Sequence, residues 1–216
     1  MLGLEVFSIK RKKTPSTGQD LKIINRLLVR DTIRKLGPIS RHEVARKTGL
    51  TPSTITVITS ELIKQDIIKE TGYGESGGGR RPILLELNPK AGYVLGVRIQ
   101  KGDVLIGIFD LTGTLISKQS YVFQSISPEE LGKLIADSFQ WLCQSNNINP
   151  DQVRWCGVTS PGLVDSQQGI IVRSSNLDWH GANLKKIIAT NLHNIPVHIE
   201  QNVKAAALAE LENGCA

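Results

Sequence analysis

The sequence lacks the cysteine and histidine patterns that bind metals or build disulfide frameworks. Its three cysteines, Cys143, Cys156 and Cys215, are far apart and odd in number, and their spacing matches no zinc or redox motif. The four histidines are scattered and form no ligand set. The sequence therefore predicts no metal site and no cofactor, and small buried thiols are the expected role of the cysteines.

Long apolar runs are also absent. No segment reaches the roughly 20 apolar residues that are needed to cross a bilayer, and the amino terminus has no apolar core of a secretory signal. These absences predict a soluble, cytoplasmic protein with no membrane partner. The 216 residues leave room for a small module and one further domain of ordinary size, so two domains are expected.

Charge is distributed unevenly along the chain. Residues 1–90 contain 17 Lys and Arg against 9 Asp and Glu, a net charge of +8, whereas residues 91–216 contain 9 against 11, a net charge of −2. A basic segment fused to a mildly acidic one is typical of phosphate binding confined to one end. The basic run at residues 10–13 lies in a polar lead-in, so residues 1–19 are expected to form a disordered arm. Whether this arm contacts DNA or only aids solubility stays open.

Two short helices joined by a tight turn are predicted in the middle of the basic segment. Ser40 and Glu43 have the spacing of a capping box, in which each side chain bonds the backbone amide of the other residue. Gly49 supplies the left-handed residue that ends the first helix. Thr51 caps the second helix, and Pro52 occupies its first turn, where a missing N–H costs nothing. The second helix is expected to end at about residue 66.

The second helix has two different faces. Ile55, Ile58 and Leu62 recur at helical spacing and are expected to pack on the first helix. The opposite face begins with small hydroxyl residues, which can enter a major groove and bond base edges or phosphates. An ordinary capped surface helix is the alternative, because Ser and Thr are also good helix starters.

A hairpin with a glycine-rich, basic tip follows the two helices. Residues 67–73 and 82–87 are β-prone runs that flank the tip at residues 74–81. Arg80 and Arg81 can insert into a narrow minor groove, although a plain solvated loop is the alternative. Residues 20–88 are thus predicted to form a winged helix-turn-helix domain that binds double-stranded DNA. Its candidate DNA-binding residues are Arg41, Thr51, Ser53, Thr54, Thr56, Arg80 and Arg81.

A second domain is expected from residue 91, because Pro89 disfavours helical geometry before it and the composition changes there. Three strands in an antiparallel meander come first, and the stretch at residues 161–183 is expected to be irregular. The expected elements are strands at 93–100, 104–110 and 114–123, a helix at 127–144, a strand at 153–160, a helix at 184–192, a strand at 195–200 and a helix at 203–211. This order, βββαβαβα, predicts an α/β domain.

Several ordered motifs resemble the ROK family, which unites repressors, open reading frames and sugar kinases. They are the winged-helix module and the segments 92–97 (GYVLGV), 157–165 (GVTSPGLVD), 176–179 (NLDW) and 200–210 (EQNVKAAALAE). Winged-helix members of this family, such as the xylose repressors, are sugar-responsive transcription regulators. The resemblance implies a ribonuclease H-like, actin-like fold whose two lobes enclose a sugar and, in kinases, ATP. Residues 91–216 account for the first lobe, so the domain is interpreted as truncated.

The resemblance also implies that the chain is not an enzyme. The positions that handle Mg²⁺ and phosphate in the family's kinases fall on Arg98, Gln100 and Gly102, and the catalytic base falls on Asn202. A cation is unsuited to a place near a metal, and an amide does not accept a proton near neutral pH. The alternative is a sugar kinase with a regulatory DNA-binding module, which ATP turnover would reveal.

Sugar-contacting positions of the family are better preserved. The resemblance implies a turn beneath the sugar, contacts from two asparagines to its hydroxyls and a glutamate at a strand end. The candidate sugar-binding residues are Ser160, Pro161, Gly162, Asn176, Glu200 and Asn202. Asp165 is expected to brace the following hairpin, and Trp155 and Trp179 are expected to pack in the core. Without the resemblance, a plain turn and a loop asparagine would be the simpler interpretation.

These observations predict a DNA-binding transcriptional regulator, a repressor of sugar-utilisation genes, with a non-catalytic effector domain for a monosaccharide. Because one wall of the sugar cleft is expected to be missing, the sugar response is expected to be weak or lost. A DNA-binding remnant without a sugar response is therefore a further alternative. A homodimer would suit a palindromic operator, but the sequence leaves the oligomeric state open.

Overall fold

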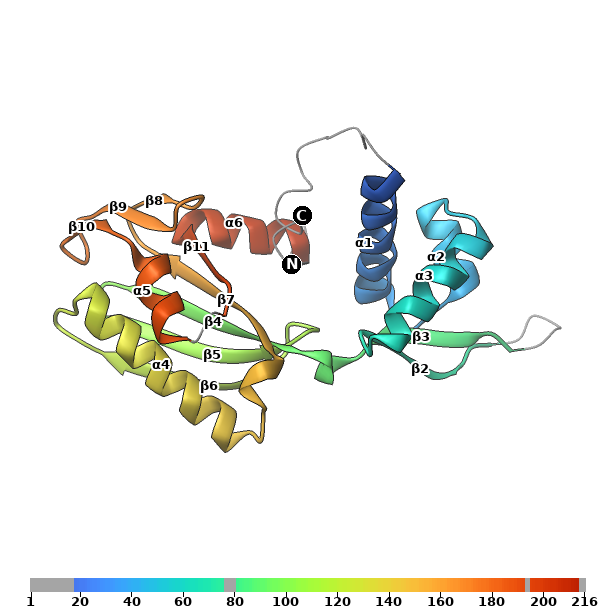
Figure 1. Ribbon diagram of the computed structural model, residues 1–216, viewed down its shortest axis with the longest axis horizontal. Helices are drawn as coiled ribbons and strands as arrows, with labels where there is room; N and C mark the ends of the chain where they lie inside the picture. The colour runs from blue at the N-terminus through green and yellow to red at the C-terminus, as the bar shows by residue number, and fades with distance from the viewer. Residues whose placement is uncertain (1–17, 76–80, 193–194, 214–216) are drawn as a thin grey trace. The chain divides into compact units, whose positions relative to one another are not determined.

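The computed structural model describes residues 18–75, 81–192 and 195–213 (Figure 1). These residues form two compact units divided between Ala91 and Gly92. The division follows a short 3-10 helix, η1 (Pro89–Ala91), in which the side-chain oxygen of Asn88 accepts a hydrogen bond from the Lys90 amide at 3.2 Å. Each unit has a hydrophobic core of its own.

The described residues of the first unit form helices and a small sheet. The elements are α1 (Gly18–Leu36), β1 (Ile39–Ser40), α2 (Arg41–Thr48), α3 (Pro52–Lys64), β2 (Ile68–Tyr73) and β3 (Ile83–Leu87). The sheet has the order β1-β3-β2, and both pairings are antiparallel. The core of this unit contains fully buried apolar side chains from all three helices and from both β2 and β3. They include Val29, Ile33, Val44, Ile55, Leu62, Ile68 and Leu85. The predicted winged helix-turn-helix fold is confirmed.

The caps predicted for α2 and α3 are confirmed in detail. Ser40 Oγ accepts a hydrogen bond from the Glu43 amide at 3.3 Å, and the Glu43 carboxylate accepts one from the Ser40 amide at 3.0 Å. Gly49 ends α2 with φ of 70°, a left-handed conformation that favours glycine. At the start of α3, Thr51 Oγ1 accepts from the Thr54 amide at 3.3 Å. Local signals therefore determine where both helices begin.

Helix α1 corrects the expected boundary of the basic arm. Gly18 and Gln19, which the sequence assigned to the arm, are the first residues of α1. Residues 1–17 lie outside the described residues. The helix buries Val29 and Ile33, one turn apart, in the core of the unit. Such tertiary packing stabilises most helices in proteins and leaves little signal at the residues where the helix starts.

The second unit is built around a mixed sheet with the order β11-β7-β4-β5-β6. Strands β4 (Tyr93–Gln100), β5 (Asp103–Asp110) and β6 (Leu115–Val122) form the antiparallel meander that was predicted. Strand β7 (Val153–Ser160) pairs with β4 in parallel, and β11 (Val197–Gln201) pairs with β7 in parallel. The α/β class is therefore confirmed, and the five predicted strands of this sheet are present.

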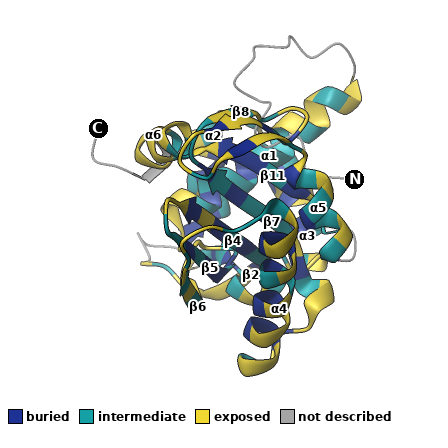
Figure 2. Cartoon of the chain, turned by 90° about the vertical axis from the view of Figure 1, so that its left-hand side faces the viewer, coloured by how far each residue is buried: buried dark blue, intermediate teal, exposed yellow. Residues whose placement is uncertain are grey.

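Helices α4 (Pro128–Ser145) and α5 (Leu184–Asn191) pack against each other and against this sheet. The buried side of α4 includes Leu131 and Ile135, which belong to the same core as Leu95 of β4. Figure 2 shows the buried residues along the strands and on one side of α4, whose outer side is exposed. Helix α6 (Asn202–Asn213) follows β11 directly.

A second small sheet lies where the sequence predicted an irregular stretch. Strands β8 (Leu163–Asp165), β9 (Ile170–Ser174) and β10 (Trp179–Ala182) pair antiparallel in the order β10-β9-β8. Strands of this length carry too few residues for alternating hydrophobicity to identify them. Asp165 braces the β8–β9 turn as expected, because its Oδ1 accepts from the amides of Gln167 and Gln168 at 3.0 Å each.

Two further properties concern only the part of the chain that is described. No helix in it is both long and apolar enough to cross a membrane, and it contains no cluster of three or more potential metal ligands. Cys143 and Cys156 are buried free thiols, and burial raises their pKa values to about 11 and about 12. Both thiols are therefore protonated at neutral pH, and Cys215 lies outside the described residues.

Candidate nucleic-acid interface and candidate sugar pocket

The amino-terminal half of α3 presents hydroxyl side chains on its outer face. Ile55 and Ile58 are buried, and this fixes which side of the helix faces outward. Ser53 and Thr56 are exposed, as the helical spacing predicted, whereas Thr54 is half-buried. The first turn of α3 can therefore meet a partner without disturbing the core.

The hydroxyl groups at the start of α3 are held in a defined arrangement. Thr51 Oγ1 lies 3.0 Å from Ser53 Oγ and 2.9 Å from Thr54 Oγ1, and Thr56 Oγ1 donates to the Pro52 carbonyl at 2.9 Å. Each oxygen keeps acceptor capacity, and the backbone amides of a helix start favour an anion. This arrangement can bind a phosphate oxygen or a base edge.

The β2–β3 hairpin forms the base of the predicted wing. Gly74 N donates to the Pro82 carbonyl at 2.9 Å, which closes the two strands below the tip. Arg81 is exposed next to this closure. The other wing arginine, Arg80, lies in the segment 76–80, outside the described residues.

Arg41 is placed differently from the other candidate DNA-binding residues. It is the first residue of α2, and its Nε donates to Thr59 Oγ1 at 3.1 Å. One of its terminal nitrogens also donates to Glu70 Oε1 at 3.0 Å. The structure therefore holds the Arg41 guanidinium between α3 and β2 and not within the exposed hydroxyl face.

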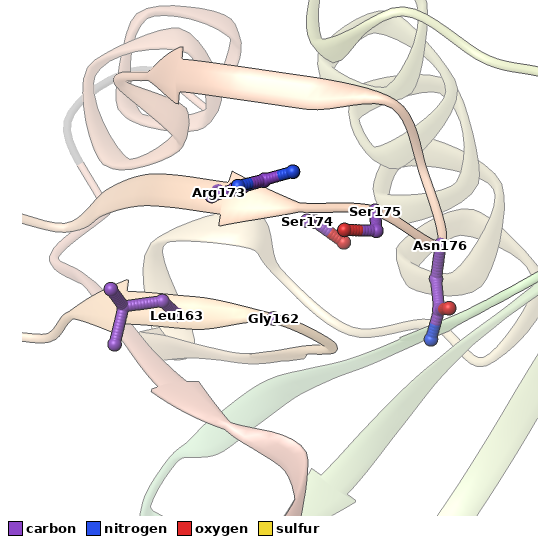
Figure 3. Close-up of a pocket in the computed structure, with 6 residues that line it drawn as sticks. All are labelled: Gly162, Leu163, Arg173, Ser174, Ser175 and Asn176. Carbon is purple, nitrogen blue, oxygen red and sulfur yellow. The ribbon is translucent and has the colours of Figure 1, made fainter.

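The second unit contains an open pocket of about 420 Å³ between β8, β9 and the turn after β9 (Figure 3). Its lining residues are Gly162, Leu163, Arg173, Ser174, Ser175 and Asn176. Two of the predicted sugar-binding residues, Gly162 and Asn176, are brought together here. The other three polar residues of the lining were missed, although they directly precede Asn176 in the sequence and make one polar run with it.

Close backbone approach shapes this pocket at Gly162. Its φ is 104°, and a Cβ atom there would lie 2.4 Å from the Arg173 carbonyl oxygen and 2.8 Å from Ser174 Cα. Ser174 is fully buried, and its Oγ has no hydrogen-bond partner among the described residues. An unpaired buried hydroxyl costs free energy, so this site can gain from a ligand or a water that bonds to Ser174.

Ser160 and Pro161 form the turn that leads into the pocket but do not line it. Ser160 is buried at the end of β7, and its Oγ donates to the Pro161 carbonyl at 3.2 Å. In the parallel pairing of β7 with β11, Ser160 lies opposite Gln201. The carboxyl ends of these two strands thus meet at one edge of the sheet, which is where ligands bind in many α/β folds.

Glu200 is engaged by its neighbours. Its carboxylate accepts hydrogen bonds from Lys204 Nζ and Ser166 Oγ, both at 2.7 Å, and from the Gln201 amide at 3.0 Å. Burial raises the pKa of Glu200, but these bonds and the Lys204 charge outweigh burial and hold the pKa below its ordinary value. The structure does not bring Glu200 into the pocket, and the ion pair accounts for its position.

Asn202 is also bonded within the protein. Its Nδ2 donates to the Ile99 carbonyl at 3.0 Å, while its Oδ1 is buried without a partner among the described residues. Asn202 does not line the pocket.

The first hairpin of the second unit holds an ion pair next to its turn. Arg98 donates to Asp103 Oδ2 at 3.1 Å, and Gln100 is paired with Asp103 in the strand register. The Arg98 cation is thus balanced by an acid from the adjacent strand.

Comparison with known proteins supports both parts of this description. A family model described as "ROK family" matches residues 94–215, and a model described as "Winged helix-turn-helix DNA-binding" matches residues 18–69. The xylose repressor of Bacillus spizizenii is 35% identical over 197 residues, covering 91% of this chain and 50% of that repressor. The DNA-binding transcriptional dual regulator NagC of Escherichia coli K12 is 26% identical over 190 residues, covering 88% of this chain and 47% of NagC.

A solved structure extends the comparison to three dimensions. A ROK family transcriptional regulator described as a homolog of the E. coli MLC protein superimposes with a TM-score of 0.70 at 28% identity, covering 88% of this chain and 48% of the regulator. The chain therefore spans about half the length of the relatives it matches. The predicted resemblance and fold class are confirmed.

Proposed function

The chain belongs to the ROK family, and from this premise we propose that it is a DNA-binding transcriptional regulator, a repressor of sugar-utilisation genes. The observation that carries the proposal is the exposed, hydroxyl-lined first turn of α3 within the basic half of the chain. Residues 20–88 are the proposed DNA-binding domain, and residues 91–216 are the proposed effector domain. A cytoplasmic location is part of the proposal, because a DNA-binding function requires it.

DNA recognition is proposed to use α3 and the wing together. The hydroxyls of Ser53, Thr54 and Thr56, with Thr51 at the cap, would meet base edges and phosphates in the major groove. Arg81 would meet the narrower minor groove beside it, and Arg80 is proposed for the same role from the sequence alone. A second copy on the other half of a palindromic site would make the operator complex a homodimer.

A monosaccharide is the proposed effector, and the pocket at Gly162 and Asn176 is its proposed site. Similar proteins include a xylose repressor and an N-acetylglucosamine repressor, and polar groups of Ser174, Ser175 and Asn176 line the pocket. A sugar can change the affinity of the protein for its operator only if it binds two conformational states of the protein with different affinities. Because the pocket is open in this chain, we expect weak sugar binding, which calorimetry with xylose and N-acetylglucosamine measures.

We propose that the chain does not catalyse phosphoryl transfer. The Arg98–Asp103 ion pair stands where a kinase needs a site for metal and phosphate, and the Asn202 amide stands where it needs a base. The competing function, a sugar kinase with a DNA-binding module, predicts ADP production from ATP in the presence of xylose, glucose or N-acetylglucosamine. A coupled assay is expected to detect no turnover, and turnover above the ATP-only control contradicts the proposal.

The DNA-binding proposal is tested with labelled duplex and fluorescence anisotropy. A random-sequence duplex of about 40 base pairs accommodates two half-sites one or two helical turns apart, and selection by the protein from such a library yields an operator-like duplex. Binding is expected to weaken steeply as salt rises, because Lys and Arg displace counterions. Sedimentation with and without the selected duplex gives the oligomeric state. Failure to bind any duplex at low salt ends the proposal.

A further inference from the structure

We propose that Arg41 is a positioning residue, which holds the wing hairpin at a fixed angle to the recognition helix α3 and does not itself contact DNA. The inference rests on the proposed DNA-binding function. It revises the role that the sequence suggested for Arg41, which was included among the candidate DNA-binding residues.

The first half of the link joins Arg41 to α3. Thr59 is fully buried, and its Oγ1 donates to the Thr56 carbonyl at 3.3 Å. That oxygen can therefore accept, and it receives Arg41 Nε at 3.1 Å. Since Thr59 is packed in the core one turn after Thr56, the guanidinium is fixed to the rigid part of α3.

The second half of the link joins Arg41 to β2. Its terminal nitrogen donates to Glu70 Oε1 at 3.0 Å. Glu70 pairs with Leu85 of β3 and is the last regular residue before a register shift between Glu70 and Gly72. A bulge bends its strand and increases the local twist, so the direction of the rest of the hairpin depends on how the strand is held at this point.

The backbone of Arg41 is anchored to the same hairpin. Ser40, the residue before it, pairs with Leu84 of β3. The backbone at Arg41 therefore starts from the sheet, and the side chain spans from there to both α3 and β2. The neighbouring pair between Lys69 and Glu86, at 3.0 Å, lies within the hairpin and makes no connection to α3.

The link is better suited to setting geometry than to stabilising the fold. The side chains of Arg41 and Glu70 are 29% and 44% exposed, and ion pairs at such sites contribute only about 0–1 kcal/mol. A fixed angle matters for DNA, however, because α3 and the wing must reach two grooves at the same time. Loss of the link should therefore lower DNA affinity and leave the melting temperature nearly unchanged.

The sign of the effect at Glu70 separates this role from a direct phosphate contact. If Arg41 met phosphate, Glu70→Gln would free the cation and remove a negative charge, so affinity for DNA would rise or stay equal. If Arg41 positions the wing, the same change weakens the Arg41–Glu70 half of the link, and DNA affinity falls although the protein has become more positive. These two outcomes cannot both occur.

The experiment compares Arg41→Met, Glu70→Gln and the double variant of the full chain on the duplex selected by the parent protein. Each single variant is expected to weaken binding about tenfold, equivalent to ~1.4 kcal/mol, and the double variant is expected to be no weaker than either, because one link is lost in all three. The slope of log affinity against log salt should stay the same, since no phosphate contact is removed. Glu86→Gln is the matched control and should bind like the parent.

Equal or tighter binding by Glu70→Gln overturns the inference, as does a salt slope that falls by about one in Arg41→Met. A measurement on the protein without DNA tests the link independently of the proposed DNA-binding function. Backbone order parameters from ¹⁵N relaxation should decrease in β2 for both single variants and not for Glu86→Gln, and unchanged order in β2 refutes the inference. If the parent binds no duplex but the order parameters of β2 decrease in the two single variants, the proposed function is refuted and the role of Arg41 in holding β2 is supported.

Discussion

The side-chain amide of Asn202 donates a hydrogen bond to the carbonyl oxygen of Ile99 at 3.0 Å, although the two residues are 103 positions apart in the chain. The bond joins the first residue of α6 to β4. The bond orients the Asn202 side chain with its nitrogen toward the Ile99 carbonyl. A carboxylate has no N–H to donate and could not make this bond. Asn202, which the family resemblance places where a kinase has its base, thus makes a structural hydrogen bond that requires an amide.

Asn202→Asp is accordingly expected to destabilise the second unit and to gain no activity. The aspartate carboxylate and the Ile99 carbonyl are both acceptors, so the carbonyl would lose its donor. A buried carbonyl without a hydrogen bond costs about 1–3 kcal/mol. All three tryptophans lie after residue 91, so their fluorescence in a urea titration reports on this unit. Gln201→Glu, at the exposed neighbouring position, is the control and should unfold like the parent. A more stable Asn202→Asp variant, or one that turns over ATP, contradicts the expectation.

Gly162→Ala is expected to damage the pocket through the backbone. The added Cβ would lie 2.4 Å from the Arg173 carbonyl oxygen at a φ of 104°, so strand β8 must shift away from β9 or the turn must unfold. We expect a loss of about 2–4 kcal/mol in unfolding free energy and the loss of any sugar binding seen by calorimetry. Gly157→Ala is the matched control, because a Cβ there meets nothing within 4 Å. Equal stability of both variants would show that the β7–β8 turn can adapt to a side chain at position 162.

Glu200→Gln tests the ion pair at the end of β11 through its pH dependence. The folded protein holds the pKa of Glu200 below its ordinary value of 4.5, so the stabilisation is complete above pH 4.5 and is lost as the pH falls through the folded pKa. The variant should be less stable than the parent by about 1–2 kcal/mol at pH 7, and this difference should shrink below pH 4.5. Tryptophan fluorescence measures it, with the exposed Glu210→Gln as the control. A difference that grows in acid would mean that the pKa is raised.

The sequence predicted those elements that carry their own local signals. Ser40, Gly49 and Thr51 mark helix ends through bonds to residues at most four positions away, and the structure has all three bonds. The meander was predictable because eight-residue strands with alternating burial leave a clear pattern. The strands β8–β10 left no such pattern, because they are short and pairing with distant residues stabilises them.

In the candidate sites, too, the sequence predicted which side chains are exposed but not which distant residues they contact. The exposure of Ser53 and Thr56 follows from the position of Ile55 on the same helix, so spacing alone predicted it. The partners of Arg41 do not follow from spacing, because Thr59 and Glu70 lie 18 and 29 residues away. A family resemblance indicates where a residue type recurs, and only coordinates indicate which neighbour takes up its hydrogen bonds.

Arg81→Ala is expected to weaken DNA binding in a way that the Arg41 variant does not. Arg81 is exposed at the base of the wing and, within the described residues, has no ion-pair partner that would hold it away from a groove. Removing it should cost about 1–3 kcal/mol on a duplex with an A·T-rich flank and should lower the salt slope by about one. Anisotropy titrations at several salt concentrations measure both quantities.

The control for Arg81 is Lys90→Ala, which removes the same charge from an exposed site in η1. If the basic charge of residues 1–90 acted only as a diffuse attraction, both variants would weaken binding equally and on every duplex. A wing that enters a minor groove predicts a larger loss for Arg81→Ala, and a loss that diminishes when the A·T-rich flank is replaced by G·C pairs, since the wider groove has a weaker negative potential. Equal losses on both flanks would leave Arg81 as a general phosphate contact and remove the wing from sequence recognition.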